Sequence, residues 1–268
     1  MLQKKIAVFG TGPAGLAVGW AALRKNYRVR FFSKDFNKSV LNGCQYLHAE
    51  IPGIPDRYKV ECCDINYRLV GTVDGYRRKV YGPEYDGTVS PMELSGIHKA
   101  WDIRATYNAL WDLIIDSPYI DRITQADISH EWIAETWHYM MQGRYDMVIS
   151  TIPAPALCNG KHAFTSRKIR AVGYELPAEQ QNIMSEVVCD GTMDNSWYRQ
   201  ASVFGYRTIE WPGYEDVVHN KVVTVRKPVS HECTCYPDII RLGRYGAWRK
   251  GILVHHVFQE AERIFQRW

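Results

Sequence analysis

The sequence predicts an α/β fold in which a parallel sheet of strand–helix–strand units is interrupted by an inserted, mostly β domain. Near the N-terminus, residues 5–9 read as a short apolar strand, residues 16–23 as an apolar helix and residues 27–33 as a second strand. This order within about 30 residues is a βαβ unit, the repeating element of a Rossmann-type sheet. Residues 36–95 and 158–235 instead alternate between apolar and polar side chains and are punctuated by Gly and Pro, which is typical of β-hairpins rather than helices.

Further elements of the parallel sheet are expected outside these two β-rich regions. Residues 97–115 carry apolar side chains near helical spacing and precede Ser117-Pro118, so we expect a helix there. Residues 146–150 form a buried-strand pattern, and residues 239–242 and 253–265 are expected to form a strand and a helix. The predicted division is a discontinuous Rossmann domain over residues 1–35, 96–157 and 236–268, and a substrate domain over residues 36–95 and 158–235.

Composition and charge exclude several classes of protein. The 268 residues are 46% hydrophobic and 23% charged, as in an ordinary globular protein. The net charge of +4 falls short of the basic surface of a dedicated duplex-DNA binder, but it is compatible with an anionic substrate. No apolar run is long enough to span a membrane, and the first strand leaves no room for a signal peptide. We therefore expect a cytoplasmic location, which would be the host cytoplasm if the protein is phage-encoded.

The seven cysteines do not predict a disulfide framework, because their number is odd in a chain of this length. Two groupings raise the question of a metal: Cys62-Cys63 and His231-x-Cys233-x-Cys235. Structural zinc sites usually contain paired Cys-x2-Cys turns, and the sequence has none. The sequence therefore predicts reduced thiols and no metal site.

A glycine-rich loop follows the first strand and predicts a dinucleotide site. Gly10 permits a tight turn, Gly12 lets the backbone approach a pyrophosphate, and Gly15 lets the helix pack closely on the strand. With the intervening Pro13 and Ala14, the loop opens a helix whose N-terminal N–H groups attract phosphates. The strand before the loop and the helix after it supply the context that a three-glycine match needs.

The end of the second strand leaves the identity of the dinucleotide open. An acidic residue normally accepts hydrogen bonds from the adenosine ribose at this position, but Ser33 and Lys34 occupy it and Asp35 follows. A Ser-Lys pair suits a 2′-phosphate and would indicate NADP, whereas Asp35 turned back toward the ribose would suit FAD.

Three further segments resemble the flavoprotein group of UDP-galactopyranose mutases and amine oxidases. They are residues 41–48 (Leu-Asn-Gly-Cys-Gln-Tyr-Leu-His), 146–153 (Asp-Met-Val-Ile-Ser-Thr-Ile-Pro) and 242–249 (Leu-Gly-Arg-Tyr-Gly-Ala-Trp-Arg). The resemblance implies FAD as the cofactor, with the last segment leading into a helix that faces the flavin. Where the mutases have Asp-Met at the start of that helix, this sequence has Ile-Leu. The cofactor contacts implied by the resemblance are Gln45, Gly243, Arg244, Ile252 and Leu253, beside the glycine loop, Ser33 and Lys34.

Candidate catalytic residues lie in two places. The resemblance brings His48, together with His255 and His256, near the flavin, where a neutral imidazole can accept a proton from a substrate ammonium group. Two arginines stand among aromatic residues in the middle of the chain and are predicted to clamp an anionic group of the substrate. Ordinary cross-strand pairs of Tyr and Arg are the alternative explanation for this pattern. The second set consists of Tyr198, Arg199, Tyr206 and Arg207.

These features predict an FAD-dependent oxidase or dehydrogenase. The expected reaction is oxidative deamination of an amine or amino-acid-like group, which in compact phage flavoproteins resembling this one is borne on a modified thymidine in DNA. One alternative is a flavin-dependent mutase acting on a nucleotide sugar, in which the two arginines hold the diphosphate. Another is a flavin- or nucleotide-binding sensor without catalytic activity.

Overall fold

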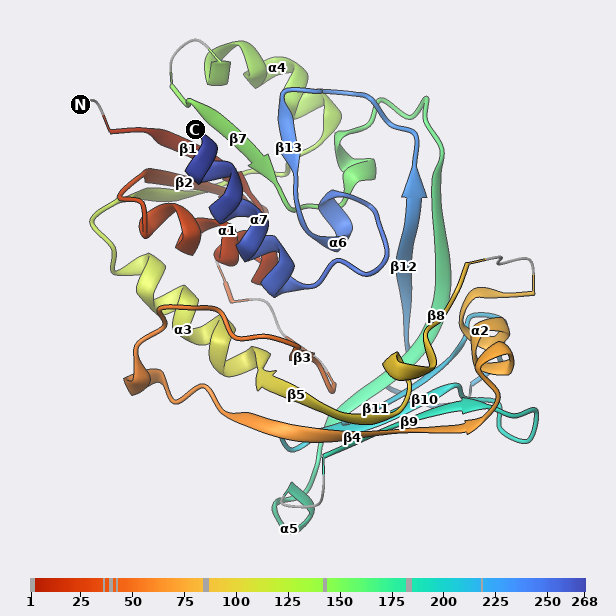
Figure 1. Cartoon of the computed structure of the whole chain (residues 1–268). Coiled ribbons are helices and arrows are strands. Elements are labelled where there is room, and N and C mark those ends of the chain that lie inside the picture. The colour runs from red at the N-terminus through yellow and green to blue at the C-terminus, as the bar shows by residue number, and fades with distance from the viewer. Residues whose placement is uncertain are drawn as a thin grey trace.

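The computed structural model describes residues 3–35, 37–38, 41, 43–83, 87–141, 144–181, 185–217 and 219–268, and it contains two sheets (Figure 1). The smaller sheet has five parallel strands in the order β13-β7-β1-β2-β6. This confirms the predicted Rossmann-type arrangement. Its strands are β1 (Lys5–Phe9), β2 (Arg28–Ser33), β6 (Ile120–Gln125), β7 (Met147–Ser150) and β13 (Ile239–Arg241).

Both faces of the five-stranded sheet are buried, as a parallel sheet requires. Ile6 and Val8 point to one face of β1, and Ala7 and Phe9 point to the other; all four are fully buried. Helices α1 (Pro13–Leu23), α3 (Ile103–Ile115) and α7 (Val254–Arg267) cover the first face, while α4 (His130–Met141) and the 3-10 helix η3 (Ala154–Leu157) cover the second.

The larger sheet has eight strands in the order β12-β8-β11-β10-β9-β4-β5-β3 and curls beneath the Rossmann part (Figure 1). Its neighbouring strands run antiparallel except for the parallel pair of β4 and β9. The prediction of an inserted, mostly β unit is thus confirmed. Its strands are β3 (Tyr46–Leu47), β4 (Cys62–Gly71), β5 (Gly96–Asp102), β8 (Phe164–Glu175), β9 (Glu186–Gly191), β10 (Arg199–Val203), β11 (Tyr206–Pro212) and β12 (Val223–His231).

The chain leaves the Rossmann part and returns to it twice. Short helices line these excursions and the returns: η1 (Asp56–Tyr58), α2 (Val73–Tyr81), η2 (Pro91–Glu93), α5 (Ala178–Gln181) and α6 (Gly243–Gly246). Among the described residues, no helix combines the length and the apolar character needed to cross a bilayer.

Three expectations from the sequence differ from the structure in the first excursion. The segment expected to be a helix from residue 97 is strand β5 up to Asp102, whose side chain accepts a hydrogen bond from the Arg104 N–H at 2.7 Å and starts α3 at Ile103. Because β5 pairs with β4 and β3, the boundary expected at residue 96 does not separate the two sheets. The same region also contains a helix, α2, which begins at the capping side chain of Thr72.

Candidate functional site

The glycine loop forms an open cradle at the carboxyl end of β1. A Cβ atom added to Gly12 would meet no heavy atom within 4 Å, whereas one added to Gly15 would lie 2.0 Å from the carbonyl oxygen of Gly10. Gly12 thus leaves space for a ligand, while Gly15 is needed for the approach of α1 to the strand. No side chain caps α1, so its first N–H groups are directed into the open space. This arrangement fits the pyrophosphate of a dinucleotide.

The C-terminal segment completes the opposite side of this cradle. A Cβ atom on Gly243 would lie 3.1 Å from the Cβ of Ala14, so α6 sits directly beside the start of α1. Three buried polar atoms in this neighbourhood have no hydrogen-bond partner in the described part of the chain: Oγ of Ser150, Nε of Arg244 and Nδ1 of His255. Buried polar atoms are normally paired, so these three are suited to a polar ligand. Ile252 and Leu253 lead into α7, where the Leu253 N–H donates to Nδ1 of His256 at 3.3 Å.

The other predicted cofactor residues lie at the margins of the cradle. Ser33 ends β2, and its Oγ is 2.9 Å from Oγ1 of Thr11 in the glycine loop. Lys34 is exposed and 3.5 Å from the Asp127 carboxylate, and Asp35 is exposed as well. Gln45 is exposed in the segment before β3. Their roles in nucleotide binding stay predictions, and Asn42 of the same segment lies outside the described residues.

One face of the eight-stranded sheet carries a continuous set of polar side chains, and we call this face the inner face. The register of β10 and β11 pairs Arg199 with Glu210, so both side chains project from it. Arg199 donates a hydrogen bond to the Tyr46 hydroxyl at 3.0 Å, and the Tyr46 and Tyr67 hydroxyls contact each other. Lys227 lies 2.8 Å from the Glu210 carboxylate. These five side chains form one network across strands β3, β4, β10, β11 and β12.

The inner face connects to the cradle through histidines. The rings of Tyr46 and His48 lie 5.1 Å apart between centroids, and His48 and His255 lie 6.4 Å apart. Since His255 belongs to the first turn of α7, His48 links the network to the helix that borders the cradle. His48, predicted as an active-site residue, is exposed and stands at the junction of the two parts.

The segment before β3 and helix α3 cover the other end of the inner face. The Arg104 guanidinium stacks 3.5 Å from the centre of the Tyr206 ring and donates to the Leu41 carbonyl oxygen at 2.8 Å. The Cys44 N–H donates to Oγ1 of Thr208. Tyr206, a predicted substrate contact, is therefore half covered by Arg104 on the inner face.

Burial and charge set the protonation states in the network. Burial alone would raise the pKa of the Glu210 carboxyl, but Lys227 and Arg199 outweigh it and lower that pKa to about 2. His48 keeps an exposed part, but the surrounding protein removes solvent from most of its ring, and this, with the charge of Arg199, lowers the pKa of His48 to about 4. Burial and the neighbouring histidines lower the pKa of His255 to about 4 as well. At neutral pH the network therefore holds an ionised carboxylate, and the imidazoles of His48 and His255 beside it are neutral.

The register of β10 and β11 contradicts the prediction that Arg199 and Arg207 clamp one group together. Arg207 pairs with Ser202, and Arg199 pairs with Glu210. Side chains alternate between the two faces of a strand, so Arg199 and Arg207 project from opposite faces and cannot clamp one group together. Arg207 is exposed on the outer face. The prediction that both arginines reach one cavity is wrong.

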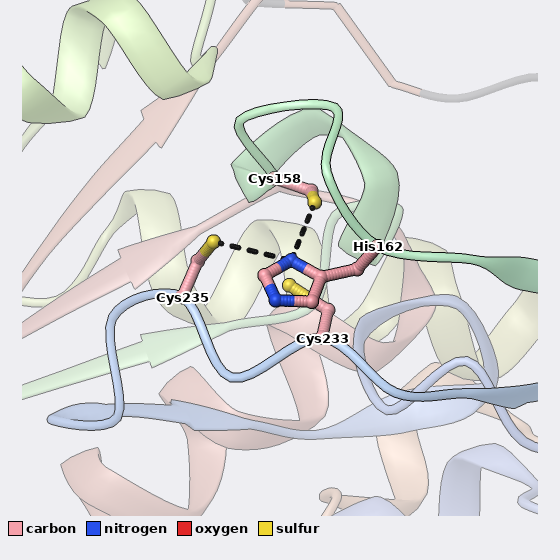
Figure 2. Close-up of side chains that lie close together, drawn as sticks. All are labelled: Cys158, His162, Cys233 and Cys235. Carbon is pink, nitrogen blue, oxygen red and sulfur yellow. Dashed lines mark hydrogen bonds between the residues drawn. The ribbon is translucent and has the colours of Figure 1, made fainter.

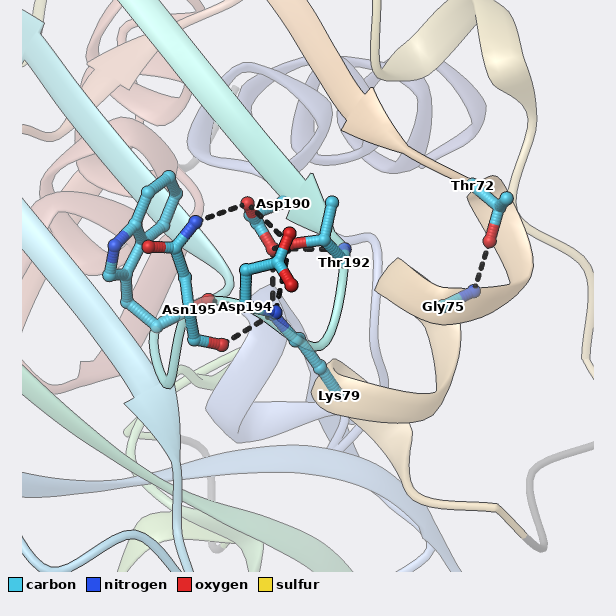
Figure 3. Close-up of polar contacts among 8 residues, drawn as sticks. Thr72, Gly75, Lys79, Asp190, Thr192, Asp194 and Asn195 are labelled. Atoms are coloured by element: carbon cyan, nitrogen blue, oxygen red, sulfur yellow. Dashed lines mark hydrogen bonds and ion pairs between the residues drawn. The ribbon is translucent and has the colours of Figure 1, made fainter.

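Tyr198 has a packing role that the sequence did not reveal. Its side chain is fully buried, its hydroxyl donates to Glu210 at 2.8 Å, and Lys227 donates to the same hydroxyl at 3.0 Å. The preceding loop is held from α2: Lys79 donates to the carbonyl oxygens of Asn195 at 2.8 Å and Trp197 at 3.2 Å (Figure 3). The cluster of polar and aromatic residues at 194–198 is thus largely explained by internal contacts.

Several members of the network were missed in the sequence. Glu210 could have been found from Tyr206, because alternation along one strand gives both the same face. Tyr46, Tyr67 and Lys227 carry no local signal, since only pairing between distant strands brings them together. Arg104 was hidden in a segment expected to be in the middle of a helix.

Comparisons with known proteins agree with this fold. No family model matches the chain, and no curated protein matches its sequence. Among solved structures, it is similar to PqsL of P. aeruginosa in complex with 2-aminobenzoylacetate (TM-score 0.58, 8% identity, 99% of this chain and 86% of that one). It is also similar to the p-nitrophenol 4-monooxygenase PnpA from Pseudomonas putida DLL-E4 (TM-score 0.56, 12% identity, 98% and 79%) and to CmlS, a flavin-dependent halogenase (TM-score 0.55, 11% identity, 98% and 56%). The chain therefore has the fold of these three proteins.

Proposed function

We propose that the protein is an FAD-dependent oxidoreductase whose substrate binds on the inner face of the eight-stranded sheet. The observation that carries this proposal is the continuity of the site: the open glycine cradle and the charged network meet at His48 and His255. A bound dinucleotide would extend from Gly12 past Gly243 toward this junction. The similarity of fold to a flavin-dependent halogenase supports FAD as that dinucleotide.

The charge of the inner face favours a substrate with an anionic group. Arg104, Arg199 and Lys227 supply three cations, and Glu210 supplies one carboxylate, so these four side chains carry excess positive charge. A carboxylate or phosphate bound beside Arg199 would offset it. This supports an amino-acid-like substrate more directly than a simple amine.

The same site has a group suited to the amine. FAD, when bound, accepts the hydride that oxidation of an amine to an imine releases, and hydrolysis of the imine then frees ammonia. An ammonium group must lose a proton before its carbon can give up a hydride. His48 is neutral and can accept a hydrogen bond from that group, although its low pKa makes it a weak base.

The first test is the absorption spectrum of the purified protein followed by an assay for hydrogen peroxide with amines and amino acids. We expect a flavin spectrum that bleaches anaerobically with substrate and peroxide release in air. A colourless protein that takes up no flavin but binds NADP would overturn the cofactor assignment. A flavin-containing protein that no amine reduces would overturn only the amine substrate.

Oxygenation of an aromatic substrate is a second candidate, favoured by the fold shared with p-nitrophenol 4-monooxygenase. It would require consumption of a reduced nicotinamide and incorporation of an oxygen atom into the product. Mass spectrometry of products formed under 18O2 separates this reaction from deamination, in which the carbonyl oxygen comes from water. The mutase alternative loses part of its support, because Arg199 and Arg207 lie on opposite faces and cannot share a diphosphate.

A DNA-borne substrate, such as a modified thymidine, stays part of the proposal. Its support is a group of basic side chains on the outer face of β8, β11 and β12, where Arg226 lies directly opposite Lys168. Like charges in that position repel each other unless an anion lies between them. The group comprises Lys168, Arg170, Arg207 and Arg226. None of these four side chains forms an ion pair with a described residue.

Binding of oligonucleotides to this outer face can be tested by charge reversal. We expect the double variant Lys168→Glu/Arg226→Glu to weaken binding of DNA and to reduce its dependence on salt, with unchanged flavin content. If the variant binds DNA as the wild type does, the outer face is not the contact and the substrate is a free small molecule or a nucleotide held elsewhere.

A further inference from the structure

Four potential metal ligands meet where the two sheets are joined. Cys158 and His162 lie in the connection between η3 and β8, and Cys233 and Cys235 lie in the connection between β12 and β13. Figure 2 shows the pairs projecting toward each other from opposite loops. One ligand atom from each residue lies within 4.8 Å of the other three. Cys158 and Cys233 are buried, and His162 and Cys235 are half-buried.

The distances between these atoms match a tetrahedral zinc site. Nδ1 of His162 lies 3.4 Å from Sγ of Cys158 and 3.6 Å from Sγ of Cys235. With Zn–S bonds near 2.3 Å and Zn–N bonds near 2.0–2.1 Å, a tetrahedron has an N–S edge of about 3.6 Å. The two observed edges are therefore close to those of a zinc tetrahedron, and the remaining ligand atoms lie within 4.8 Å of one another.

We propose that Cys158, His162, Cys233 and Cys235 bind a structural zinc ion. Soft thiolates and one imidazole are the donors that zinc prefers, and four protein ligands leave no open position for a substrate or water. The site is separate from the inner face and from the nucleotide cradle, and its assignment is independent of the proposed function.

The surroundings compensate the charge that this site would carry. Zinc binding displaces the protons of three thiols, and the resulting Zn²⁺ with three thiolates and a neutral imidazole has a net charge of −1. The Arg241 guanidinium lies 3.6 Å from Sγ of Cys233 and donates to the Cys235 carbonyl oxygen at 2.6 Å. Its Nη1 is buried without another partner among the described residues, so Arg241 is placed to neutralise the thiolates.

The proposed zinc site departs from the expectation, drawn from the sequence, of reduced thiols and no metal site. His231, the first member of the expected grouping, does not join it: Nδ1 of His231 accepts a hydrogen bond from the Cys233 N–H at 3.0 Å. The missing ligands come from the distant pair Cys158-x3-His162. Antiparallel pairing of β8 with β12 brings the two half-sites together, with Phe164 opposite His231. No local spacing in the sequence could show this.

Its position gives the ion a mechanical role. Both connections run between the eight-stranded sheet and the Rossmann sheet, so the ion would link the two sheets where the chain leaves the Rossmann part for the second time and returns to it. The connection that carries Cys158 begins at Thr151, whose Oγ1 donates to the Phe9 carbonyl oxygen at 2.8 Å behind the glycine loop. Loss of the ion should therefore loosen the wall of the cradle as well as the junction.

The experiment measures metal in the full-length protein, purified without a metal-affinity tag from zinc-supplemented cells. Elemental analysis should find about one zinc per chain that survives dialysis against a weak chelator. Cys235→Ser should lower the zinc content at least about tenfold, since one ligand is lost. His162→Cys should keep the zinc, because four thiolates also form a tetrahedral site. Cys62→Ser (exposed) and Cys189→Ala (buried in β9) are controls that should hold zinc as the wild type does.

Cobalt substitution of the wild-type protein provides a test that does not depend on the folding of variants. A tetrahedral thiolate site should give intense d–d bands at wavelengths longer than oxidised flavin absorbs. A wild-type protein without bound zinc, equal zinc in Cys235→Ser and wild type, or a cobalt spectrum typical of octahedral oxygen ligands would each overturn the proposal. None of these results would bear on whether the protein binds FAD.

Discussion

Nζ of Lys79 in α2 lies 2.7 Å from Oδ1 of Asp190 at the end of β9, and both side chains are almost completely shielded from solvent (Figure 3). The carboxylate also accepts hydrogen bonds from the Thr192 N–H at 3.0 Å and from Asn195 at 2.9 Å. The ion pair therefore fixes both α2 and the loop that leads to Arg199. A buried charge with this many partners is costly to leave alone.

Replacing Lys79 should destabilise the protein strongly. We expect Lys79→Met to lower the free energy of unfolding by about 3–5 kcal/mol, because Asp190 would keep a buried and uncompensated charge. Urea denaturation followed by circular dichroism measures the change. Lys99→Met removes a solvent-exposed ion pair with Asp64 and should cost less than about 1 kcal/mol. A loss below about 1 kcal/mol for Lys79→Met would mean that the pair is dispensable.

Substitutions at two glycines of the loop should have different effects. Gly12→Val should fold normally and lose FAD affinity by more than about tenfold, since its side chain would occupy open space that the pyrophosphate needs. Gly15→Val should fail to fold stably, because even its Cβ would collide with the Gly10 carbonyl. Flavin released by denaturation and the melting temperature of the apoprotein separate the two effects. Normal FAD binding by Gly12→Val would contradict the cradle.

Substitutions of Arg199 and Arg207 should have different effects on kcat/KM. Arg199→Ala should lower kcat/KM by roughly thirtyfold or more, equivalent to about 2–3 kcal/mol for a lost charge-assisted contact with the substrate. Arg199→Lys should recover only part of this loss, because an ammonium lacks the planar fork. Arg207→Ala is the matched control on the outer face and should stay within about twofold of wild type on a small substrate. FAD content should be normal in all three variants.

If Arg199→Ala also stays within about twofold, the inner face does not hold the anionic group and Arg199 serves the Tyr46 network alone. That result would leave the cofactor assignment intact. It would redirect the search for the substrate contact to Arg104, which stacks on Tyr206 at the inner face.

The protein should lose stability as the pH falls below the pKa of histidine in the unfolded chain. His255 is buried, and its folded pKa of about 4 lies below the usual 6.5. Protons therefore bind the unfolded chain first, and stability that is full above pH 6.5 is lost as the pH falls toward 4. The slope contributed by one such group is at most about 1.4 kcal/mol per pH unit.

Urea denaturation of wild type and His255→Gln at several pH values across this window measures the slope. The variant should show a flatter dependence, while His219→Gln, which alters an exposed side chain, should keep the wild-type slope. Identical slopes for wild type and His255→Gln would show that His255 titrates normally in the folded protein.

The sequence predicts the Rossmann part well because its signals are local. Strand β1, the glycine loop and α1 are consecutive, and each glycine has a distinct steric reason that can be seen within the loop. Strand β5 was misread because Ile97 and Trp101 are spaced as on a helix, while their true partners lie in β4 and β3. Helix α2 was missed because its N-cap, Thr72, follows directly on a strand.

The candidate site was predictable only in part, because it depends on pairing between distant strands. Arg199 was identified because it stands among aromatic residues, but its partners Tyr46 and Glu210 come from β3 and β11. The face occupied by Arg207 follows from the register with β10, which no single segment determines. The two halves of the proposed zinc site are likewise far apart in sequence and meet only through β8 and β12.

The order of strands in the five-stranded sheet has a consequence for how the protein folds. Strand β1 lies between β7 and β2, and β7 also pairs with β13. The pairing of β1 with β7 and of β7 with β13 therefore cannot form until much later parts of the chain have been synthesised. Contacts of such long sequence separation slow folding and leave strand edges exposed in intermediates. Gly12 and Gly243 border the same cradle, but Gly12 is synthesised near the beginning of translation and Gly243 near its end. A nascent chain should therefore be unable to retain the nucleotide until α6 and α7 have left the ribosome, and cofactor capture should be among its last folding events.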